Sequence, residues 1–331
     1  MPNPAMGDLH IQAALTDVSV AWAQEQDVFC AEKIFANIPV QKQSDKYFSY
    51  NREDWFRSDA RSRAPGTESA GGGWRISTDV YFADRIALHQ DVSDPERANA
   101  DAALNLDADA TEYITQQLLL KKEKDFVSAF FTTGVWDGAS SSTDMTGQAA
   151  PASTATNFRQ WNDAASTPIE DIRGEITNIA RLTGRKPNTL VLGPQVWTAL
   201  ADHPDILDRI KYTEKGVVTT DLIASLLDLQ SVHVMWAVEE TGIEGTTAPT
   251  KAFVAGKQAL LCYVEKSPGL RKPSAGYTFV WTGMTGVPAQ GARIKRFRME
   301  ANESDRVEGE QWYAQKQVSS NLGAFFTAAV P

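Results

Sequence analysis

Residues 167 to 227 decide the fold: TPIEDIRGEITNIARLTGRKPNTLVLGPQVWTALADHPDILDRIKYTEKGVVTTDLIASLL. Isoleucines at helical spacing between positions 172 and 179 predict an amphipathic helix with one buried stripe. Gly184 then follows as a helix stop. The apolar run at 189–192, TLVL, lies between turn residues and predicts a buried strand. This order of helix, strand and helix is typical of a structural α+β core, and the stretch contains no cluster of nucleophile, base or metal ligands.

The composition indicates a soluble globular protein. The chain has 331 residues, of which 42% are hydrophobic and 22% charged, enough for one large or two ordinary domains. No run approaches the ~18 apolar residues that cross a bilayer, and we expect no signal peptide at the N-terminus. Cys30 and Cys262 form no CxxC or Cys/His pattern, which favours reduced thiols. The net charge of -10 argues against binding nucleic acid through a broad basic surface.

Residues 47–90 predict an extended hairpin, here called the arm. Its two ends are aromatic and strand-like, with partial period-2 alternation over residues 74–81, as in a strand half exposed to solvent. Its middle is rich in arginine and glycine, and the Gly-Gly-Gly run at 71–73 allows turns. That run lacks the Lys-Ser/Thr pair of a phosphate-binding loop, so it indicates chain flexibility.

Two helices and a loop are predicted on either side of the arm. A helix is expected within residues 17–37. After the arm, Asp109 and Glu112 fit a capping box that opens a long helix over residues 109–131. Residues 134–157 are rich in Gly, Ser, Thr and Ala, which is typical of a long loop.

The last third of the chain is rich in strand-like runs. These runs are residues 232–236, 252–255, 259–264, 277–281 and 292–299, followed by a final strand and an apolar tail. Helices therefore dominate the first part, the middle is mixed, and strands dominate the end. This order favours the α+β class.

This layout resembles the major capsid proteins of tailed bacteriophages, which have the HK97-type fold. The resemblance runs from about residue 15 to the end and rests on the order of the parts. It implies five segments: an N-terminal arm and helix (1–46), an E-loop (47–90), a peripheral domain with a spine helix (91–185), an axial domain (186–275) and a return to the peripheral domain (276–331).

The resemblance also implies a function. It predicts a subunit that self-assembles as hexamers and pentamers into an icosahedral head shell around double-stranded DNA, within a virion assembled in the host cytoplasm. The implied partners are copies of the chain and portal, scaffolding and decoration proteins, with no membrane, cofactor or catalytic site. Scaffolding is expected from a separate protein or a cleaved precursor. An acidic chain is compatible with this function, because a strongly basic lining would hold the DNA too tightly.

One departure from the family concerns covalent crosslinks. Some members join a lysine of the E-loop to an asparagine of a neighbouring subunit. Here residues 47–120 contain no lysine, and the nearest ones are Lys46 and Lys121. The sequence therefore predicts a shell without isopeptide bonds through this loop.

Non-covalent contacts must then hold the subunits together. The arginines of the arm can be solvated charges, or donors that pair with carboxylates in a geometry unavailable to lysine. The second interpretation gives the candidate inter-subunit contacts Arg57, Arg61 and Arg63 on one copy and Asp101, Asp107 and Asp109 on the next.

Two alternatives stay open. An encapsulin-like nanocompartment shell shares the fold. A soluble cytosolic enzyme or binding protein whose site is not visible in the sequence is the other, although the four histidines match no metal-binding spacing. The acidic residues near position 107 also lack the pattern of an EF-hand loop.

Overall fold

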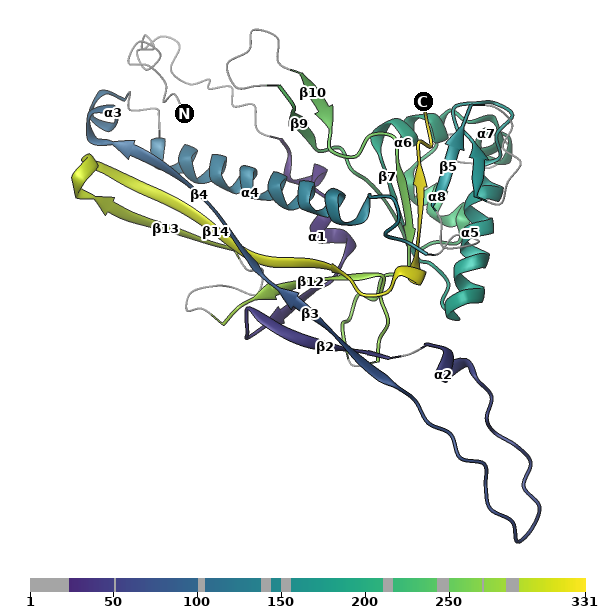
Figure 1. Cartoon of the computed structure of the whole chain (residues 1–331). Coiled ribbons are helices and arrows are strands. Elements are labelled where there is room, and N and C mark those ends of the chain that lie inside the picture. Colours follow the sequence, from purple (N-terminus) through teal and green to yellow (C-terminus); the bar gives the residue numbers. More distant parts are fainter. Residues whose placement is uncertain are drawn as a thin grey trace.

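The computed structural model describes residues 24–50, 52–100, 105–137, 144–149, 156–210, 217–242, 250–269, 271–283 and 292–331. Figure 1 shows two sheet-containing halves and a long projection. A long helix lies along one sheet, short helices surround the other, and the arm extends away from both.

The described helices are α1 (Ala31–Ile34), α2 (Arg52–Phe56), α3 (Asp94–Asn99), α4 (Leu106–Phe130), α5 (Pro168–Thr183), α6 (Pro194–Ala201), α7 (Pro204–Ile210) and α8 (Thr220–Leu227). The described strands are β1 (Asn37–Val40), β2 (Ser44–Tyr50), β3 (Ile76–Phe82), β4 (Asp84–Ser93), β5 (Met145–Gln148), β6 (Asn157–Arg159), β7 (Thr189–Leu192), β8 (Ser231–Val234), β9 (Val238–Glu240), β10 (Lys251–Phe253), β11 (Ala259–Cys262), β12 (Gly276–Trp281), β13 (Ala292–Met299), β14 (Ser304–Gln317) and β15 (Gly323–Thr327).

The long strand β14 organises the five-stranded sheet. It pairs antiparallel with β4, β13 and β12, and β12 pairs in parallel with β1. Helix α4 packs on this sheet through Ile114 and Leu118, both buried. Gly309 permits the close approach, because a Cβ there would overlap Ile114 and lie 2.9 Å from Leu118 Cδ1. Burying an aliphatic side chain such as Leu118 contributes about 1.5–3 kcal/mol.

The six-stranded sheet has the order β6-β5-β15-β11-β7-β8. All four residues of β7 are buried, and α5 buries the isoleucine stripe that the sequence predicts. Gly184 ends α5 with a φ of 64°, a left-handed conformation that glycine adopts without steric cost. The helix, the stop and the strand are confirmed as predicted.

The start of α4 differs from the prediction. The helix begins at Leu106, and the side chain of Asn105 caps it by accepting the N–H of Ala108 at 3.2 Å. Asp109 lies inside the first turn and donates its backbone N–H to the carbonyl of Asn105. The predicted capping box at Asp109 and Glu112 is therefore wrong, because Asn105 takes the cap position one turn earlier.

The helix expected within residues 17–37 falls partly on residues 17–23, which lie outside the described residues. From residue 24 onward the chain forms a short 3₁₀ turn and then α1, and it leaves helical geometry at Phe35. The reason is tertiary. Residues from Asn37 onward pair with β12 as strand β1.

The loop expected at 134–157 contains a strand. Strand β5 lies inside this range and pairs in parallel with β6 and with β15. Gly147 allows this pairing, since a Cβ there would overlap the carbonyl of Ala328. Residues 138–143 and 150–155 of the predicted loop lie outside the described part of the chain.

The strands of residues 276–331 are divided between the two sheets. Strands β12 to β14 belong to the five-stranded sheet, whereas β15 pairs with β11 and β5 in the six-stranded sheet. Across the described ranges, no helix is long and apolar enough to cross a membrane.

Candidate assembly surface

The arm consists of the β2–β3 pair at its base and a long loop beyond it (Figure 1). Tyr81 and Phe279 stack at the base with ring centroids 4.5 Å apart and planes 7° apart. In contrast, every residue from Trp55 to Val80 is exposed. We call residues 55–80 the distal arm. Apart from the pairing of residues 76–80 with β2 and the contact of the Phe56 ring at Gly184, the chain gives the distal arm little packing support.

Large apolar side chains are exposed along the arm. The exposed fractions are 51% for Trp55, 57% for Phe56 and 56% for Trp74. The rings of Trp55 and Trp74 lie 5.8 Å apart. Further exposed members are Phe48, Ile76, Val80 and Phe82. Monomeric proteins rarely expose contiguous apolar surface of this kind, and where it occurs it marks an interaction site.

Sequence reasoning singled out the arginines of the arm and missed these aromatic side chains as functional residues. The available signal was a row of large apolar residues at alternate positions in a strand that pairs with only one neighbour. A strand with one buried face has apolar residues at alternate positions only. Trp74, Ile76, Val80 and Phe82 all lie on one face of this strand and are exposed, so the arm itself leaves that face unburied.

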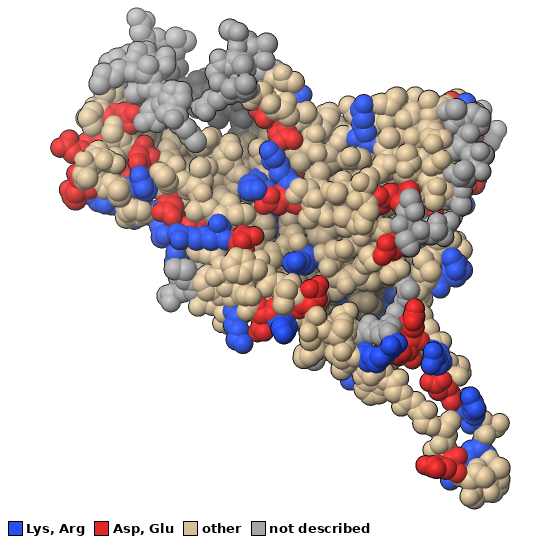
Figure 2. All heavy atoms as spheres, viewed as in Figure 1, with Lys and Arg blue, Asp and Glu red and all other residues tan. Residues whose placement is uncertain are grey.

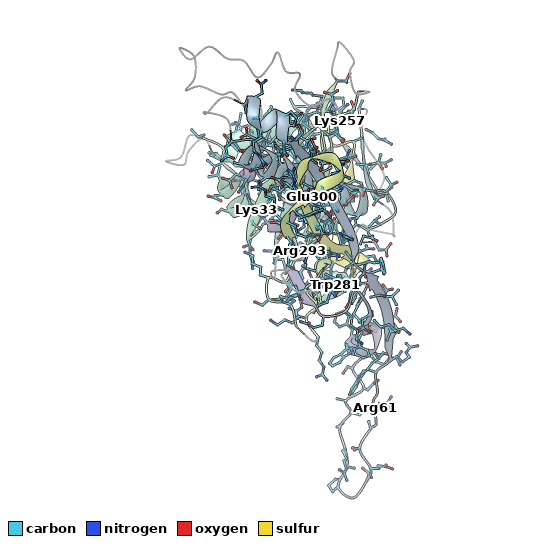
Figure 3. All side chains as sticks on the ribbon, turned by 90° about the vertical axis from the view of Figure 1, so that its left-hand side faces the viewer. Lys33, Arg61, Lys257, Trp281, Arg293 and Glu300 are labelled. Carbon is cyan, nitrogen blue, oxygen red and sulfur yellow. The ribbon has the colours of Figure 1, made fainter. Side chains whose placement is uncertain are left out.

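The three arginines proposed as contacts all lie in the distal arm and are exposed. Figure 3 shows Arg61 on the projecting loop, away from the body of the molecule. Arg63 donates a hydrogen bond to the carbonyl of Thr67. Within the described residues, Arg57, Arg61 and Arg63 form no ion pair.

The three proposed carboxylates have different positions. Asp101 lies outside the described residues. Asp107 pairs with Arg97 at 2.7 Å and with Arg296 at 2.8 Å. Asp109 is exposed and forms no ion pair in the described part of the chain. Asp107 is therefore already neutralised within its own subunit, whereas Asp109 is available to a neighbour.

The arm and the start of α4 lie at opposite ends of the molecule (Figure 1). The distal-arm arginines therefore cannot meet Asp107 or Asp109 within one chain. If these groups pair, they do so between two copies.

Two clusters of ion pairs link the neighbouring strands β4, β14 and β13. Figure 2 shows basic and acidic side chains interleaved on this side of the molecule and along the arm. Near α4, Asp305 pairs with Arg296 and Arg97, whose hydrogen bonds lower the pKa of Asp305 to about 2. On the other face, Glu310 is buried and pairs with Arg293 and Lys295. Burial opposes ionisation there, but these cations hold the pKa of Glu310 below its usual range.

No group of three or more His, Cys, Asp or Glu side chains is arranged to hold a metal ion in the ranges that the structure describes. The thiols of Cys30 and Cys262 are buried, and burial raises the pKa of Cys262 to about 12.

Solved structures with the same architecture define the class of the fold. A phage-related protein from Bordetella bronchiseptica RB50 aligns with a TM-score of 0.68 at 20% identity, over 93% of this chain and 95% of its own. The mature capsid protein of bacteriophage PhiM1 aligns with a TM-score of 0.61 at 11% identity, over 96% of this chain and 92% of its own. The fold is the HK97-like fold of phage capsid subunits.

Sequence comparison places the chain within this class. Residues 101–271, just over half of the chain, match the family model described as phage major capsid protein E. The chain belongs to this family. It is 24% identical to the major capsid protein of Burkholderia phage BcepMu over 298 residues, 88% of this chain and 89% of the relative. It is also 24% identical to the major capsid protein of Pseudomonas phage JBD67 over 327 residues, 97% of both. Its function is that of a structural protein of the phage capsid.

Proposed function

We propose that the chain assembles with copies of itself, as hexamers and pentamers, into an icosahedral shell that encloses double-stranded DNA. The exposed distal arm is the observation that supports this most strongly. Ordering a residue costs about 1–2 kcal/mol of backbone entropy, and the distal arm has no core of its own to offset this. Burial of Trp55, Phe56 and Trp74 against a neighbouring copy would supply the missing stabilisation at about 25 cal/mol per Å².

The arginines of the arm would make this contact specific through ion pairs with the adjacent copy. Arg57, Arg61 and Arg63 would pair with a carboxylate on the adjacent copy, with Asp109 first because it is free in the described chain. An exposed pair contributes about 0.2–1 kcal/mol, but a closed ring repeats each contact around its axis. Asp101 and Asp107 stay as further candidates, although Asp107 would have to exchange its present partners.

In this proposal residues 47–90 act as the E-loop and α4 as the spine helix, and residues 186–275, which supply β7, β8 and β11 of the six-stranded sheet, form the axial part. Portal, scaffolding and decoration proteins would complete assembly in the host cytoplasm. The net charge of -10 fits a container that holds DNA without sequence-specific contacts. The relatives named as phage capsid proteins favour a phage shell over an encapsulin-like compartment.

The test is the double substitution Arg61→Glu with Arg63→Glu. It should leave the circular dichroism spectrum unchanged and block or weaken assembly, measured by sedimentation and electron microscopy. A matched control, Arg181→Glu with Lys266→Glu, makes the same charge change at exposed sites of the body and should assemble normally. Normal particles from the arm variant that stay stable in raised salt would refute the role of the arginines.

A further inference from the structure

A groove of about 700 Å³ lies between the β9–β10 hairpin and the start of α6. Lys251, Lys257, Phe253 and Gln195 are among the residues that line it. Figure 3 places Lys257 at the end of the molecule opposite to Arg61. The groove is therefore a surface separate from the arm.

The walls of the groove are fixed to the rest of the molecule. The side-chain amide of Gln24 pairs with the backbone of Val238, donating to its carbonyl at 2.8 Å and accepting its N–H at 3.0 Å. Lys124 of α4 pairs with Glu239 at 2.6 Å. On the other wall, a Cβ at Gly193 would overlap the carbonyl of Gly256, so these two segments touch directly. Gln24 and Lys124 therefore hold the β9–β10 hairpin through contacts from outside its own strands.

The surface around the groove is aromatic and basic. Trp236 and Phe253 are 43% and 37% exposed, and their rings meet edge to face with centroids 6.1 Å apart. Lys251 and Lys257 are exposed and form no ion pair among the described residues. The lysines of α4, in contrast, each pair with a carboxylate. Two unpaired cations beside exposed aromatic rings fit a partner that is acidic and partly apolar.

The chain itself carries such a surface on the other side of the six-stranded sheet. Asp202 ends α6, and Leu207 and Asp208 lie on α7. Leu207 is 43% exposed, and both aspartates are exposed without an ion pair among the described residues. We call these three residues the acidic corner. Figure 1 shows α7 and the β9–β10 hairpin on opposite sides of this sheet.

We infer that the groove receives the acidic corner of a second copy of this chain. Lys251 and Lys257 would face Asp202 and Asp208, and the aromatic rim would cover Leu207. A contact between two different surfaces of one subunit is heterologous, and such contacts close into rings when the rotation between copies allows. This inference rests on the proposed function and adds a second contact, distant from the arm.

Charge reversal tests the pairing directly. In the full chain with Lys251→Glu and Lys257→Glu, carboxylates face carboxylates across the proposed contact. In the chain with Asp202→Lys and Asp208→Lys, ammonium groups face ammonium groups. Each variant should keep its circular dichroism spectrum and lose about tenfold or more of its assembled fraction, because complementary charges become like charges at the contact. The chain with all four substitutions restores opposite charges and should recover rings or shells.

The control is Lys266→Glu with Arg271→Glu, which makes the same charge change at exposed residues outside the groove and should assemble as the unchanged chain does. The inference is overturned if the unchanged chain assembles and the lysine variant assembles equally well. It is also overturned if the fourfold variant, folded by circular dichroism, assembles no better than its parents. Failure of the unchanged chain to form any ring or shell would overturn the proposed function as well.

Discussion

Asp54 and Arg75 close the base of the distal arm. The carboxylate of Asp54 accepts two hydrogen bonds from the guanidinium of Arg75, each at 3.1 Å, and one from its backbone N–H at 2.9 Å. The side-chain hydrogen bond from Arg75 lowers the pKa of Asp54. Because the pair joins α2 to the start of β3, it defines a loop whose residues between them are all exposed.

Hydrogen exchange should report the consequence. In unassembled subunits, amides between Arg57 and Gly73 should exchange rapidly and proteases should cut there, because the loop has no packing support. In assembled particles the same amides should be protected by the neighbouring copy. Equal protection in the two states would show that the arm is ordered within its own subunit.

The particle should contain no covalent crosslinks. No lysine lies between residues 47 and 120, so the arm cannot supply the amine of an isopeptide bond. Assembled material boiled in detergent with reductant should run as a single band near 36.3 kDa. A ladder of multimers would show that another lysine, such as Lys42 or Lys46 just before the arm, supplies the amine instead.

The local part of the fold could be predicted from the sequence. The α5 stripe, the Gly184 stop and the buried strand at 189–192 follow from periodicity and turn chemistry within a few residues. Strand β5 could not be found this way, because it forms through parallel pairing with β15, far along the chain. Its residues, MTGQ, carry little of the apolar signal of a strand.

The candidate assembly surface, too, could be predicted from the sequence only in part. Charge and the absence of lysine singled out Arg57, Arg61 and Arg63 from the sequence. The neutralisation of Asp107 by Arg97 and Arg296 could not be seen, since Arg296 lies on a distant strand. The groove and the acidic corner depend on which side of the sheet each element occupies, and no local pattern encodes that.

The contact of α4 with β14 should be sensitive to one methyl group. Gly309→Ala places a Cβ against Ile114 and Leu118, and overpacking of this kind costs about 1–3 kcal/mol. The midpoint of denaturant unfolding should fall accordingly. Gly71→Ala, where no atom lies within 4 Å of the new Cβ, is the matched control and should leave the midpoint unchanged. Equal midpoints for the two variants would mean that α4 can move away from the sheet without cost.

Two largely buried carboxyls of α5 should lower the stability of the folded chain as the pH rises from about 5 to about 8. Burial, the largest cause, raises the pKa of Glu175 to about 7 and that of Asp171 to about 6. Asp205 and Glu170 add negative charge near Asp171, and Trp161 and Asn178 donate the opposing hydrogen bonds. Because both pKa values are raised on folding, the folded state binds these protons more tightly. The contribution of these two carboxyls to stability is fully present below their pKa values in the unfolded chain. It is lost as the pH rises through their pKa values in the folded chain.

The substitution Glu175→Gln should reduce this pH dependence. The free energy of unfolding, measured at about pH 5 and about pH 8, should differ less in the variant than in the unchanged chain, since one pKa unit corresponds to about 1.4 kcal/mol. Glu112→Gln, at an exposed position of α4, should keep the full dependence. An unchanged slope in the Glu175 variant would show that this carboxyl titrates normally in the folded chain.

Negative-stain electron microscopy of the purified full chain tests self-assembly directly, because repeated contacts between copies are what the arm and the groove imply. We expect closed shells, or rings of five and six copies, that form without any covalent bond between subunits. A field of small isolated particles at every protein concentration, from a chain that is folded by circular dichroism, would contradict it.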